Sequence, residues 1–532
     1  MPEISEENSY AECVLRFAET IGDRLAFTSP TTNYTYRELS AAALHHAAIL
    51  RDLGVKRGDR VVVLTTPRAE SMMLMIAMNM IGAIWVCLNP QYRLREFQYV
   101  VEDAQPTLFL YISEFEGRSY EPEIRALVAD NRCIKQAVCI DGTPFVGVHL
   151  DNLAAEDGRA RYEMDFTRDR RFDAAVIVYT SGSSGNPKGA VLPNFGLMER
   201  GRGYNEHWPT KDYPRVFEFY PLNHVGGLGW VSGFGLAGGG TIHFDVRFDA
   251  ETYGETIRRE RINVLQGPPT IYQILLARDG FDFSDYEGVE WMLFSGASMP
   301  VELLRKMQTL GIGFSPIYGL TEACGGLTFT YPDGDSIETL ATTIGCSFIP
   351  DEVRVVRPDG TVAGKGEQGE IQIERSRCML EYFNRPEATQ SAFTSDGYFK
   401  TGDIAEVGER GYARFISRMS EMFKSGGYNV YPREIEVVLE GHPAVGLAAV
   451  ISMPDQLYAE VGVAYVVPDT EATAEPTADE LRKWCRERMA NFKVPKHFIV
   501  RRNLPLLPSG KADKVQLRQD ALEEPAHTVS VG

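Results

Sequence analysis

An apolar run followed at once by a loop of glycines and hydroxyl residues is the most constraining feature of this chain. Residues 174–178 predict a buried strand, and residues 179–189 read Tyr-Thr-Ser-Gly-Ser-Ser-Gly-Asn-Pro-Lys-Gly. Glycine lets the backbone approach an anion closely, and backbone N–H groups together with hydroxyls can cradle phosphate oxygens. A flexible Ser/Gly linker is the alternative, but a linker needs neither the strand before this loop nor Pro-Lys-Gly after it. The segment therefore favours a fold that holds a phosphate-binding loop at the end of a covered strand.

This loop differs from the Walker A loop of P-loop nucleotide-binding proteins. The Walker A pattern ends in Gly-Lys-Ser or Gly-Lys-Thr, whereas Lys188 follows Pro187 and precedes Gly189. A lysine at this place still supplies a positive charge for a polyphosphate. We therefore expect nucleotide binding by a different class of loop.

The composition indicates a large and acidic globular chain. Its 532 residues indicate about two to four structural units. Hydrophobic residues make up 44% and aromatic residues 11%, which is enough for an extensive core. The 73 acidic and 54 basic residues give a formal net charge of −19, which argues against a nucleic-acid partner.

Cysteine spacing and hydropathy indicate the cellular compartment in which the protein is expected. The 8 cysteines show no CxxC pair, which favours reduced core residues and a cytoplasmic location. The acidic N-terminus lacks the apolar region of a signal peptide. The apolar segment Met72–Leu88 is shorter than the roughly 20 residues of a membrane-spanning helix, and Asn79 and Gly82 interrupt it. We expect a buried helix and a short strand there, and no transmembrane segment.

Helix and strand patterns alternate over the first part of the chain. Thr35 and Glu38 form a capping-box pattern that predicts a helix ending at Gly54, and Val61–Leu64 predicts a covered strand. From about residue 350, short alternating strands and tight turns indicate a smaller β-rich unit. The last part of the chain, with a helix predicted at Pro432–Glu440, indicates a separate α+β domain. We therefore predict an α/β fold, with a large multi-subdomain N-terminal domain of covered α/β sheets and a small β-rich unit, followed by a smaller α+β domain.

Five further segments carry residues suited to nucleotide chemistry. A carboxylate in Tyr318–Glu322 suits Mg²⁺, one in Thr401–Asp403 suits ribose hydroxyls, and a lysine after Pro-Ser-Gly suits transition-state charge. The segments, in chain order, are Pro221–Gly227, Ser295–Pro300, Tyr318–Glu322, Thr401–Asp403 with Arg418, and Pro505–Lys511. Together with the 179–189 loop, they resemble the signature motifs of the adenylate-forming (AMP-binding) superfamily. This superfamily includes acyl- and aryl-CoA synthetases, peptide-synthetase adenylation domains and firefly-type luciferases, and the resemblance extends over nearly the whole chain.

The resemblance implies a set of nucleotide-binding residues. Lys511, Glu322, Thr180 and His224 are implied to be catalytic, and Thr180 and Glu322 to hold Mg²⁺. The residues implied to bind ATP or AMP are Thr180, Ser181, Gly182, Ser183, Ser184, Gly185, Lys188, Gly296, Ala297, Ser298, Tyr318, Gly319, Thr321, Glu322, Asp403, Arg418 and Lys511.

The resemblance also implies an acid site, a CoA site and a mobile C-terminal domain. The acid-site residues are His224, Val225, Gly226, Gly296, Cys324 and Gly325, and the CoA-site residues are Lys424, Ser425, Gly426 and Gly427. The implied division is an N-terminal domain of residues 1–417, a hinge at 418–420, and a mobile domain of residues 421–532 that carries Lys511. In similar enzymes Asp or Lys commonly occupies the hinge position that Ser420 holds here, so the identity of the hinge stays open.

The function implied is an ATP-dependent carboxylate–CoA ligase that forms an acyl-AMP and then an acyl-CoA thioester, with Mg²⁺ and CoA as cofactor and co-substrate. Three alternatives stay open. An adenylation enzyme that serves a carrier protein usually has Asp where Val225 stands. A luciferase-type oxygenase shares the motifs, and a catalytically silent nucleotide-binding scaffold would not need both Glu322 and Lys511.

The sequence indicates the carboxylic acid substrate only broadly. Small residues at 324–326 and apolar residues such as Trp230, Phe234 and Phe329 favour a medium-to-long aliphatic acid or a bulky aryl or alicyclic acid. These segments contain no cationic residue, so nothing in them suggests a second carboxylate on the substrate. No pattern determines the oligomeric state, although similar enzymes are frequently homodimers.

Overall fold

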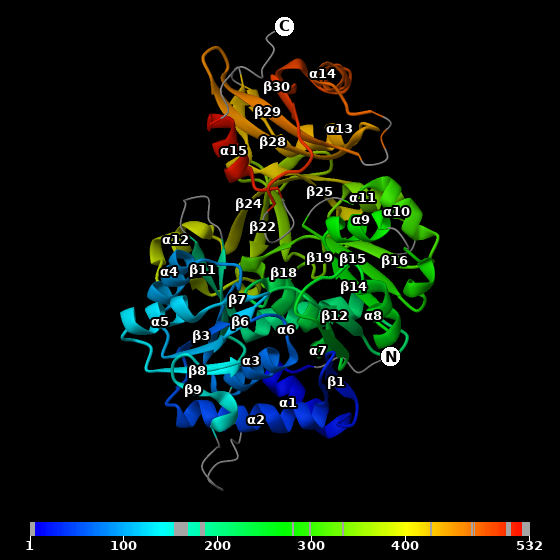
Figure 1. Cartoon of the computed structure of the whole chain (residues 1–532). Coiled ribbons are helices and arrows are strands. Elements are labelled where there is room, and N and C mark those ends of the chain that lie inside the picture. Colours follow the sequence, from blue (N-terminus) through cyan, green and yellow to red (C-terminus); the bar gives the residue numbers. More distant parts are fainter. Residues whose placement is uncertain are drawn as a thin grey trace. The chain divides into compact units, whose positions relative to one another are not determined.

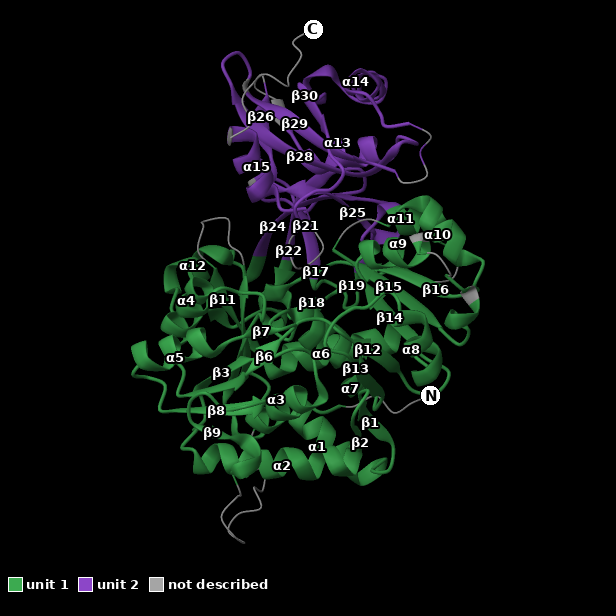
Figure 2. Ribbon diagram, in the orientation of Figure 1, with its two compact units in different colours: residues 1–341, 347–352, 373–399 green, residues 342–346, 353–372, 400–532 purple. Residues whose placement is uncertain are grey.

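The computed structural model describes residues 6–153, 169–180, 187–278, 281–296, 299–331, 335–425, 428–469, 472, 474–506 and 512–523. The chain forms two compact units, coloured separately in Figure 2. Unit 1 comprises residues 1–341, 347–352 and 373–399, and unit 2 comprises residues 342–346, 353–372 and 400–532. These units are defined by compactness, so the predicted moving boundary at 418–420 stays a prediction.

Two large sheets form the centre of unit 1 (Figure 1). The first has the order β16-β15-β14-β12-β13-β1-β2 and is parallel except for β2. Its strands are β1 (Leu25–Thr28), β2 (Asn33–Thr35), β12 (Arg215–Glu218), β13 (Thr241–Phe244), β14 (Val264–Gly267), β15 (Trp291–Ser295) and β16 (Gly313–Ile317).

The second sheet has the order β23-β11-β10-β4-β3-β5-β8-β9. Its strands are β3 (Arg60–Leu64), β4 (Ile84–Leu88), β5 (Leu108–Ile112), β8 (Gln136–Asp141), β9 (Val148–His149), β10 (Ala174–Thr180), β11 (Lys188–Pro193) and β23 (Glu381–Tyr382). Strands β4 and β5 are buried along their whole length and β3 is buried from Val61 on, which explains their continuous apolar sequences.

Helices cover these sheets. They are α1 (Tyr10–Thr20), α2 (Tyr36–Asp52), α3 (Ala69–Ile81), α4 (Leu94–Ala104), α5 (Glu121–Asp130), α6 (Asn194–His207), α7 (Ser232–Ala237), α8 (Tyr253–Glu260), α9 (Pro269–Ala277), α10 (Val301–Gln308), α11 (Ile337–Thr342, which ends in unit 2) and α12 (Pro386–Ala392). The capping box of Thr35 and Glu38 is present at α2, and the apolar segment forms helix α3 and strand β4 as predicted. Within the described ranges, no helix has the length and apolar character needed to cross a membrane.

Two further sheets lie mostly in unit 2. Four strands form the order β21-β22-β24-β25: β21 (Val353–Val356), β22 (Gln368–Glu374), β24 (Tyr398–Val407) and β25 (Ala413–Arg418). The other sheet comprises β26 (Phe423–Ser425), β27 (Tyr428–Val430), β28 (Val445–Asp455), β29 (Ala459–Pro468) and β30 (His497–Val500). The helices are α13 (Pro432–Glu440), α14 (Ala478–Arg486) and α15 (Lys514–Glu523). The α/β class, the β-rich unit and the α+β part are therefore confirmed.

Glycine permits the close packing of α6 against α7. A Cβ atom on Gly201 would lie 2.3 Å from the carbonyl oxygen of Gly233 and 2.9 Å from Cβ of Ala237. Real Cβ atoms do not approach a backbone oxygen this closely, so the two helices pack at this distance only without a side chain at position 201.

We predict that Gly201→Ala destabilises unit 1 by about 1–3 kcal/mol, because overpacking outweighs the better helix propensity of alanine. Urea unfolding followed by tryptophan fluorescence measures this, since only Trp484 of the 5 tryptophans lies in unit 2. Gly203→Ala on the same helix is the control. Its Cβ would lie 3.3 Å from the ring of Phe348, a side chain that can shift. Equal losses in the two variants would contradict the prediction.

Candidate functional site

Both ends of the phosphate-loop segment are held by hydrogen bonds. Strands β10 and β11 form an antiparallel pair in which Thr180 lies opposite Lys188, and the Thr180 hydroxyl donates to the Lys188 carbonyl oxygen at 3.4 Å. Helix α4 supports this pair, because Tyr179 donates to Asp103 at 2.8 Å and Tyr99 donates to the carbonyl oxygen of Pro187 at 2.6 Å. The predicted loop residues between these ends lie outside the described residues: Ser181, Gly182, Ser183, Ser184 and Gly185.

A tyrosine that the sequence analysis did not identify connects the predicted lysine and the predicted carboxylate. The Tyr382 hydroxyl donates to Glu322 Oε1 at 2.7 Å, and Lys188 Nζ lies 5.2 Å from the centre of the same ring. Burial and the neighbouring Glu322 carboxylate raise the pKa of Tyr382 far above its ordinary value, so the phenol keeps the proton that it donates. This arrangement brings together two motifs that are far apart in the sequence.

Backbone hydrogen bonds on both sides of Tyr382 fix its position beside Glu322 and Lys188. Tyr382 lies in β23, where it pairs with Ala190 of β11, and Phe383 N–H donates to the Gly189 carbonyl oxygen at 2.7 Å. Met379 N–H donates to the carbonyl oxygen of Glu322 at 2.6 Å. The only sequence signal was a single tyrosine beside a turn, which does not reveal a pairing with a distant strand.

The segment that carries Glu322 folds back on itself. Strands β17 (Gly319–Leu320) and β18 (Gly325–Gly326) pair, with the short 3₁₀ turn Thr321–Ala323 between them. A Cβ atom on Gly319 would lie 2.1 Å from the carbonyl oxygen of Gly325, so the pairing requires glycine. Tyr318 is buried and precedes this hairpin, while Gly296 follows β15 with φ 89°. Ala297 and Ser298 lie outside the described residues.

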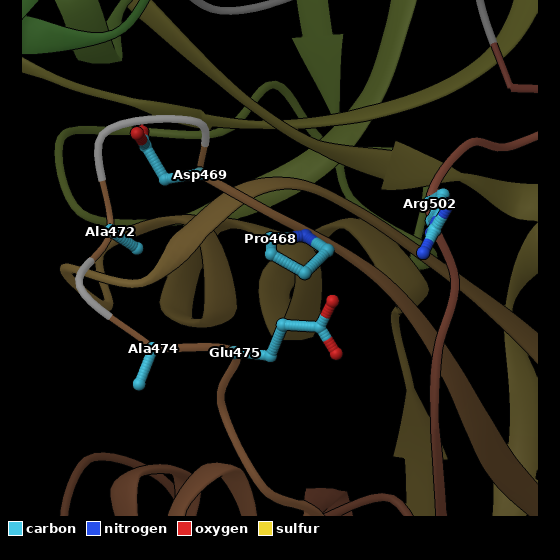
Figure 3. A pocket seen from close by; sticks show the side chains of 6 residues that line it. All are labelled: Pro468, Asp469, Ala472, Ala474, Glu475 and Arg502. Atoms are coloured by element: carbon cyan, nitrogen blue, oxygen red, sulfur yellow. The ribbon is translucent and has the colours of Figure 1, made fainter.

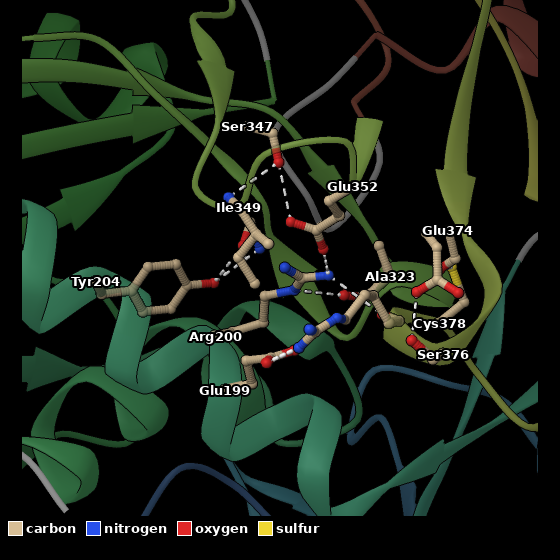
Figure 4. Close-up of polar contacts among 12 residues, drawn as sticks. Glu199, Arg200, Tyr204, Ala323, Ser347, Ile349, Glu352, Glu374, Ser376 and Cys378 are labelled. Carbon is tan, nitrogen blue, oxygen red and sulfur yellow. Dashed lines mark hydrogen bonds and ion pairs between the residues drawn. The ribbon is translucent and has the colours of Figure 1, made fainter. Parts of the chain in front are cut away.

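A buried arginine on α6 anchors the same segment (Figure 4). Arg200 Nε donates to the carbonyl oxygen of Ala323 at 3.0 Å, and the guanidinium pairs with Glu352 at 2.5 Å. Both side chains are 1% exposed or less, and Ser347 donates to the second oxygen of Glu352 at 2.9 Å. One turn along, the Tyr204 hydroxyl accepts from Gly326 N–H at 2.8 Å. Helix α6 therefore holds the residues on both sides of Cys324.

Two of the predicted acid-site segments, at 224–226 and 324–325, lie close together. His224 Nδ1 accepts from Gly226 N–H at 2.9 Å at the start of a π-helix, Gly226–Val231. A Cβ atom on Gly229 would lie 2.4 Å from the Cys324 carbonyl oxygen, so this helix packs on the Cys324 backbone. The Cys324 thiol lies against Gly196 of α6, and burial raises its pKa to about 12. Cys324 is thus held between α6 and the π-helix, with its thiol protonated.

The predicted ribose pair lies in unit 2. Asp403 and Arg418 face each other on β24 and β25, with Arg418 Nε 3.1 Å from Asp403 Oδ1. The Asp403 side chain is only 3% exposed, whereas that of Arg418 is 53% exposed. The Thr401 hydroxyl accepts from Asp403 N–H at 3.0 Å and donates to the Ile371 carbonyl oxygen at 2.7 Å. These hydrogen bonds fix the backbone of β24 beside the Asp403 carboxylate.

Unit 2 also contains the predicted CoA and lysine segments. Lys424 is exposed and Ser425 is buried on β26, which pairs with β27, whereas Gly426 and Gly427 lie outside the described residues. Lys511 also lies outside them. Lys514, at the start of α15, pairs with Glu421 at 2.6 Å and with Glu436 at 2.8 Å. These two ion pairs give Lys514 a structural role.

Two hollows in the described structure are distinct from these residues. One, of about 230 Å³, lies in unit 2 and is lined by Pro468, Asp469, Ala472, Ala474, Glu475 and Arg502 (Figure 3). Another, of about 750 Å³, lies in unit 1 and includes Arg68 and Arg247, both paired with carboxylates. None of the predicted site residues lines either of them.

Comparison with known proteins identifies the family. The family model for AMP-binding enzymes matches residues 14–383, and the model for the C-terminal domain of AMP-binding enzymes matches residues 434–511. Similar solved structures include ATP-bound MatB from Rhodopseudomonas palustris, with 28% identity, a TM-score of 0.85, and coverage of 96% of this chain and 98% of that one. The o-succinylbenzoate CoA synthetase of Bacillus subtilis in complex with an acyl-adenylate is 27% identical, with a TM-score of 0.79 and coverage of 95% and 97%.

Curated relatives agree with this match. A feruloyl-CoA synthase of an Amycolatopsis species is 31% identical over 92% of this chain and 94% of its own length. A long-chain-fatty-acid–CoA ligase of Mycobacterium tuberculosis is 31% identical over 95% of this chain and 97% of its own. The chain belongs to the AMP-binding enzyme family, as an AMP-forming acyl-CoA synthetase.

Proposed function

We propose that the protein activates a carboxylic acid with MgATP and transfers the acyl group to CoA through an acyl-AMP. The observation that carries this proposal is the contact of Tyr382 with both Lys188 and Glu322. Two oppositely charged groups on one aromatic ring suit a polyphosphate, because the ammonium attracts the anion and the carboxylate suits its counter-cation. Relatives named as CoA ligases support CoA as the acceptor.

In the first half-reaction, a carboxylate oxygen attacks the α-phosphorus, and the bond to pyrophosphate breaks. Residues 180–188 bind the departing pyrophosphate, and Tyr318 and residues 296–298 border the adenine. Asp403 accepts hydrogen bonds from the ribose hydroxyls, with Arg418 beside it. Lys511 donates to the oxygens between which negative charge develops.

The side chains of Thr180 and Glu322 are suited to bind Mg²⁺. Thr180 and Glu322 offer oxygen atoms only, the ligands that a hard cation prefers, and Tyr382 orients the carboxylate. When bound, Mg²⁺ neutralises phosphate charge. The protein's own part is to position Glu322 and Thr180.

In the second half-reaction, the CoA thiolate attacks the acyl carbon, and AMP leaves. We propose that residues 421–532 rotate about 418–420, so that Lys511 withdraws and the Lys424–Gly427 turn admits pantetheine. Ser420, at the hinge position, is a small residue that can absorb the backbone change.

We propose a medium-to-long aliphatic or a bulky aryl or alicyclic acid as the substrate, since the predicted acid-site segments contain small and apolar residues. Relatives named for feruloyl and long-chain fatty acids fall within this range. The 8 free cysteines suit a reducing cytoplasm. We propose a homodimer as the oligomer to test.

Mass spectrometry of products is the direct test. The protein is incubated with MgATP, CoA and acids that range from acetate through long fatty acids to benzoates, phenylpropanoids and alicyclic acids. AMP together with an acyl-CoA is expected for at least one acid. Acyl-AMP without thioester for every acid would favour a carrier-protein acceptor instead.

We predict that Lys511→Ala abolishes adenylation and leaves the rate of thioester formation from supplied acyl-AMP within about threefold of that of the unaltered protein. The reason is that Lys511 stabilises the negative charge that develops in the first step only. Pyrophosphate release and CoA consumption measure the two steps separately. Lys365→Ala removes a surface lysine of unit 2, paired with Glu409, and should change neither. Equal loss of both steps in Lys511→Ala would contradict the proposed division of labour.

We predict that Tyr382→Phe lowers the rate of adenylation about tenfold and raises the half-saturating Mg²⁺ concentration, since a hydrogen bond to a charged group contributes about 1.5 kcal/mol. The KM for the acid should stay unchanged, because the ring and its contact with Lys188 remain. Tyr111→Phe removes a hydroxyl that donates to the Val146 carbonyl oxygen and serves as the control. An unchanged Mg²⁺ dependence in Tyr382→Phe would show that the hydroxyl does not position Glu322.

A further inference from the structure

Two buried polar atoms beside the predicted acid site have no hydrogen-bond partner among the described residues. They are the indole Nε1 of Trp230 and the amide Oε1 of Gln266. Trp230 is 6% exposed and Gln266 is 3% exposed, so bulk water does not serve them. One is a donor and the other is an acceptor.

Gln266 lies at the carboxyl end of β14, where ligands of parallel sheets bind. Val264 pairs with Val216 of β12, so Gln266 and Glu218, each two residues further on, lie on the same face of the sheet. Phe217 and Leu265 point to the opposite face and join the core with α8, α9 and α10. The face of Gln266 is therefore the one that the π-helix Gly226–Val231 and α7 cover.

The orientation of the Gln266 amide is determined by its neighbour. Gln266 Nε2 donates to the carbonyl oxygen of Trp230 at 3.2 Å, and a carbonyl can only accept. The remaining atom, Oε1, must be the acceptor. The contact also places Gln266 against the π-helix that begins at Gly226, in the predicted acid site.

The neighbouring Glu218 shows that this face can satisfy a polar group. Glu218 is fully buried, and it accepts from Ser232 at 2.9 Å and from Tyr220 N–H at 3.0 Å. The Tyr220 ring lies 6.1 Å from that of Trp230, and its hydroxyl is a third buried atom without a described partner. Three of the buried atoms without a described partner therefore belong to Tyr220, Trp230 and Gln266, and Trp230 contacts the other two residues. Buried polar atoms are nearly always paired in folded proteins, so a bound molecule is the expected partner.

We infer that the acid bound here carries a neutral hydroxyl group in addition to its carboxylate, and that Trp230 and Gln266 bind that hydroxyl. A hydroxyl accepts from an indole N–H and donates to an amide oxygen, whereas a ketone can use only the indole. An alkyl chain would leave both atoms buried and unpaired. This inference rests on the proposed function, and within its substrate range it favours hydroxylated aryl or alicyclic acids over plain fatty acids.

Matched acids test the inference in the unaltered protein. Adenylation is measured by pyrophosphate release with 3-phenylpropanoate and its 2-, 3- and 4-hydroxy derivatives, and with cyclohexanecarboxylate and its hydroxy and oxo derivatives. At least one hydroxylated acid should exceed its parent by at least about tenfold in kcat/KM, because a site built to bind a hydroxyl discriminates against its absence. Parents that equal or exceed every hydroxylated derivative would overturn the inference.

Two variants assign the preference to these atoms. Gln266→Leu and Trp230→Phe should each reduce the kcat/KM ratio of the hydroxylated acid to its parent to about threefold or less. Each should leave the KM for ATP unchanged. Trp291→Phe, which removes an indole N–H bound to the Pro209 carbonyl oxygen at 2.9 Å, should keep the full preference. A preference that persists in both Gln266→Leu and Trp230→Phe would overturn the assignment and indicate that ordered water serves these atoms.

Failure of the inference and failure of the proposed function give different results. Turnover of acids without regard to hydroxyl groups overturns the inference alone. No pyrophosphate release with any acid, from protein that unfolds cooperatively, overturns the proposed function.

Discussion

The guanidinium of Arg200 links four segments that are distant in the sequence. It extends from α6 to the backbone oxygens of Ala323 and Arg377, and it pairs with Glu352. A buried ion pair contributes little net stability compared with well-packed apolar groups, but removal of one partner leaves an uncompensated charge that costs about 3–5 kcal/mol. The value of such a pair is the single arrangement that it enforces. Here that arrangement fixes the residue next to Glu322, so the position of the carboxylate follows from an interaction in the core.

Tyrosine hydroxyls position the polar groups of the candidate site in unit 1. The hairpin ends at Thr180 and Lys188 are held by tyrosines, Glu322 is held by Tyr382, and Gly326 is held by Tyr204. Each tyrosine provides a rigid ring for packing and one hydroxyl for a specific hydrogen bond. A site made in this way needs little reorganisation when a charged ligand binds, which is the condition for electrostatic catalysis.

Local patterns allowed much of the fold to be predicted, and long-range pairing explains what was missed. Helix α2 carries its own start and stop signals, so Thr35, Glu38 and Gly54 were sufficient to place it, and α13 has the predicted bounds Pro432–Glu440. Lys188 and Glu322 were predicted from their motifs. Tyr382 was not, because its role arises from the pairing of the two-residue strand β23 with β11. Arg200 was missed for a similar reason, since its partners Ala323, Glu352 and Arg377 come from three later segments. The unpaired atoms of Trp230 and Gln266 are visible only when every neighbour is known.

The interleaved order of the two units has a consequence for how the chain folds during synthesis. Residues 342–346 and 353–372 belong to unit 2 but leave the ribosome before residues 373–399, which belong to unit 1. Those late residues include β23 and therefore Tyr382. Unit 1 therefore cannot complete its second sheet until two segments of unit 2 have already left the ribosome. A gene fragment cut at any single point between residues 342 and 400 would deprive one unit of its own strands.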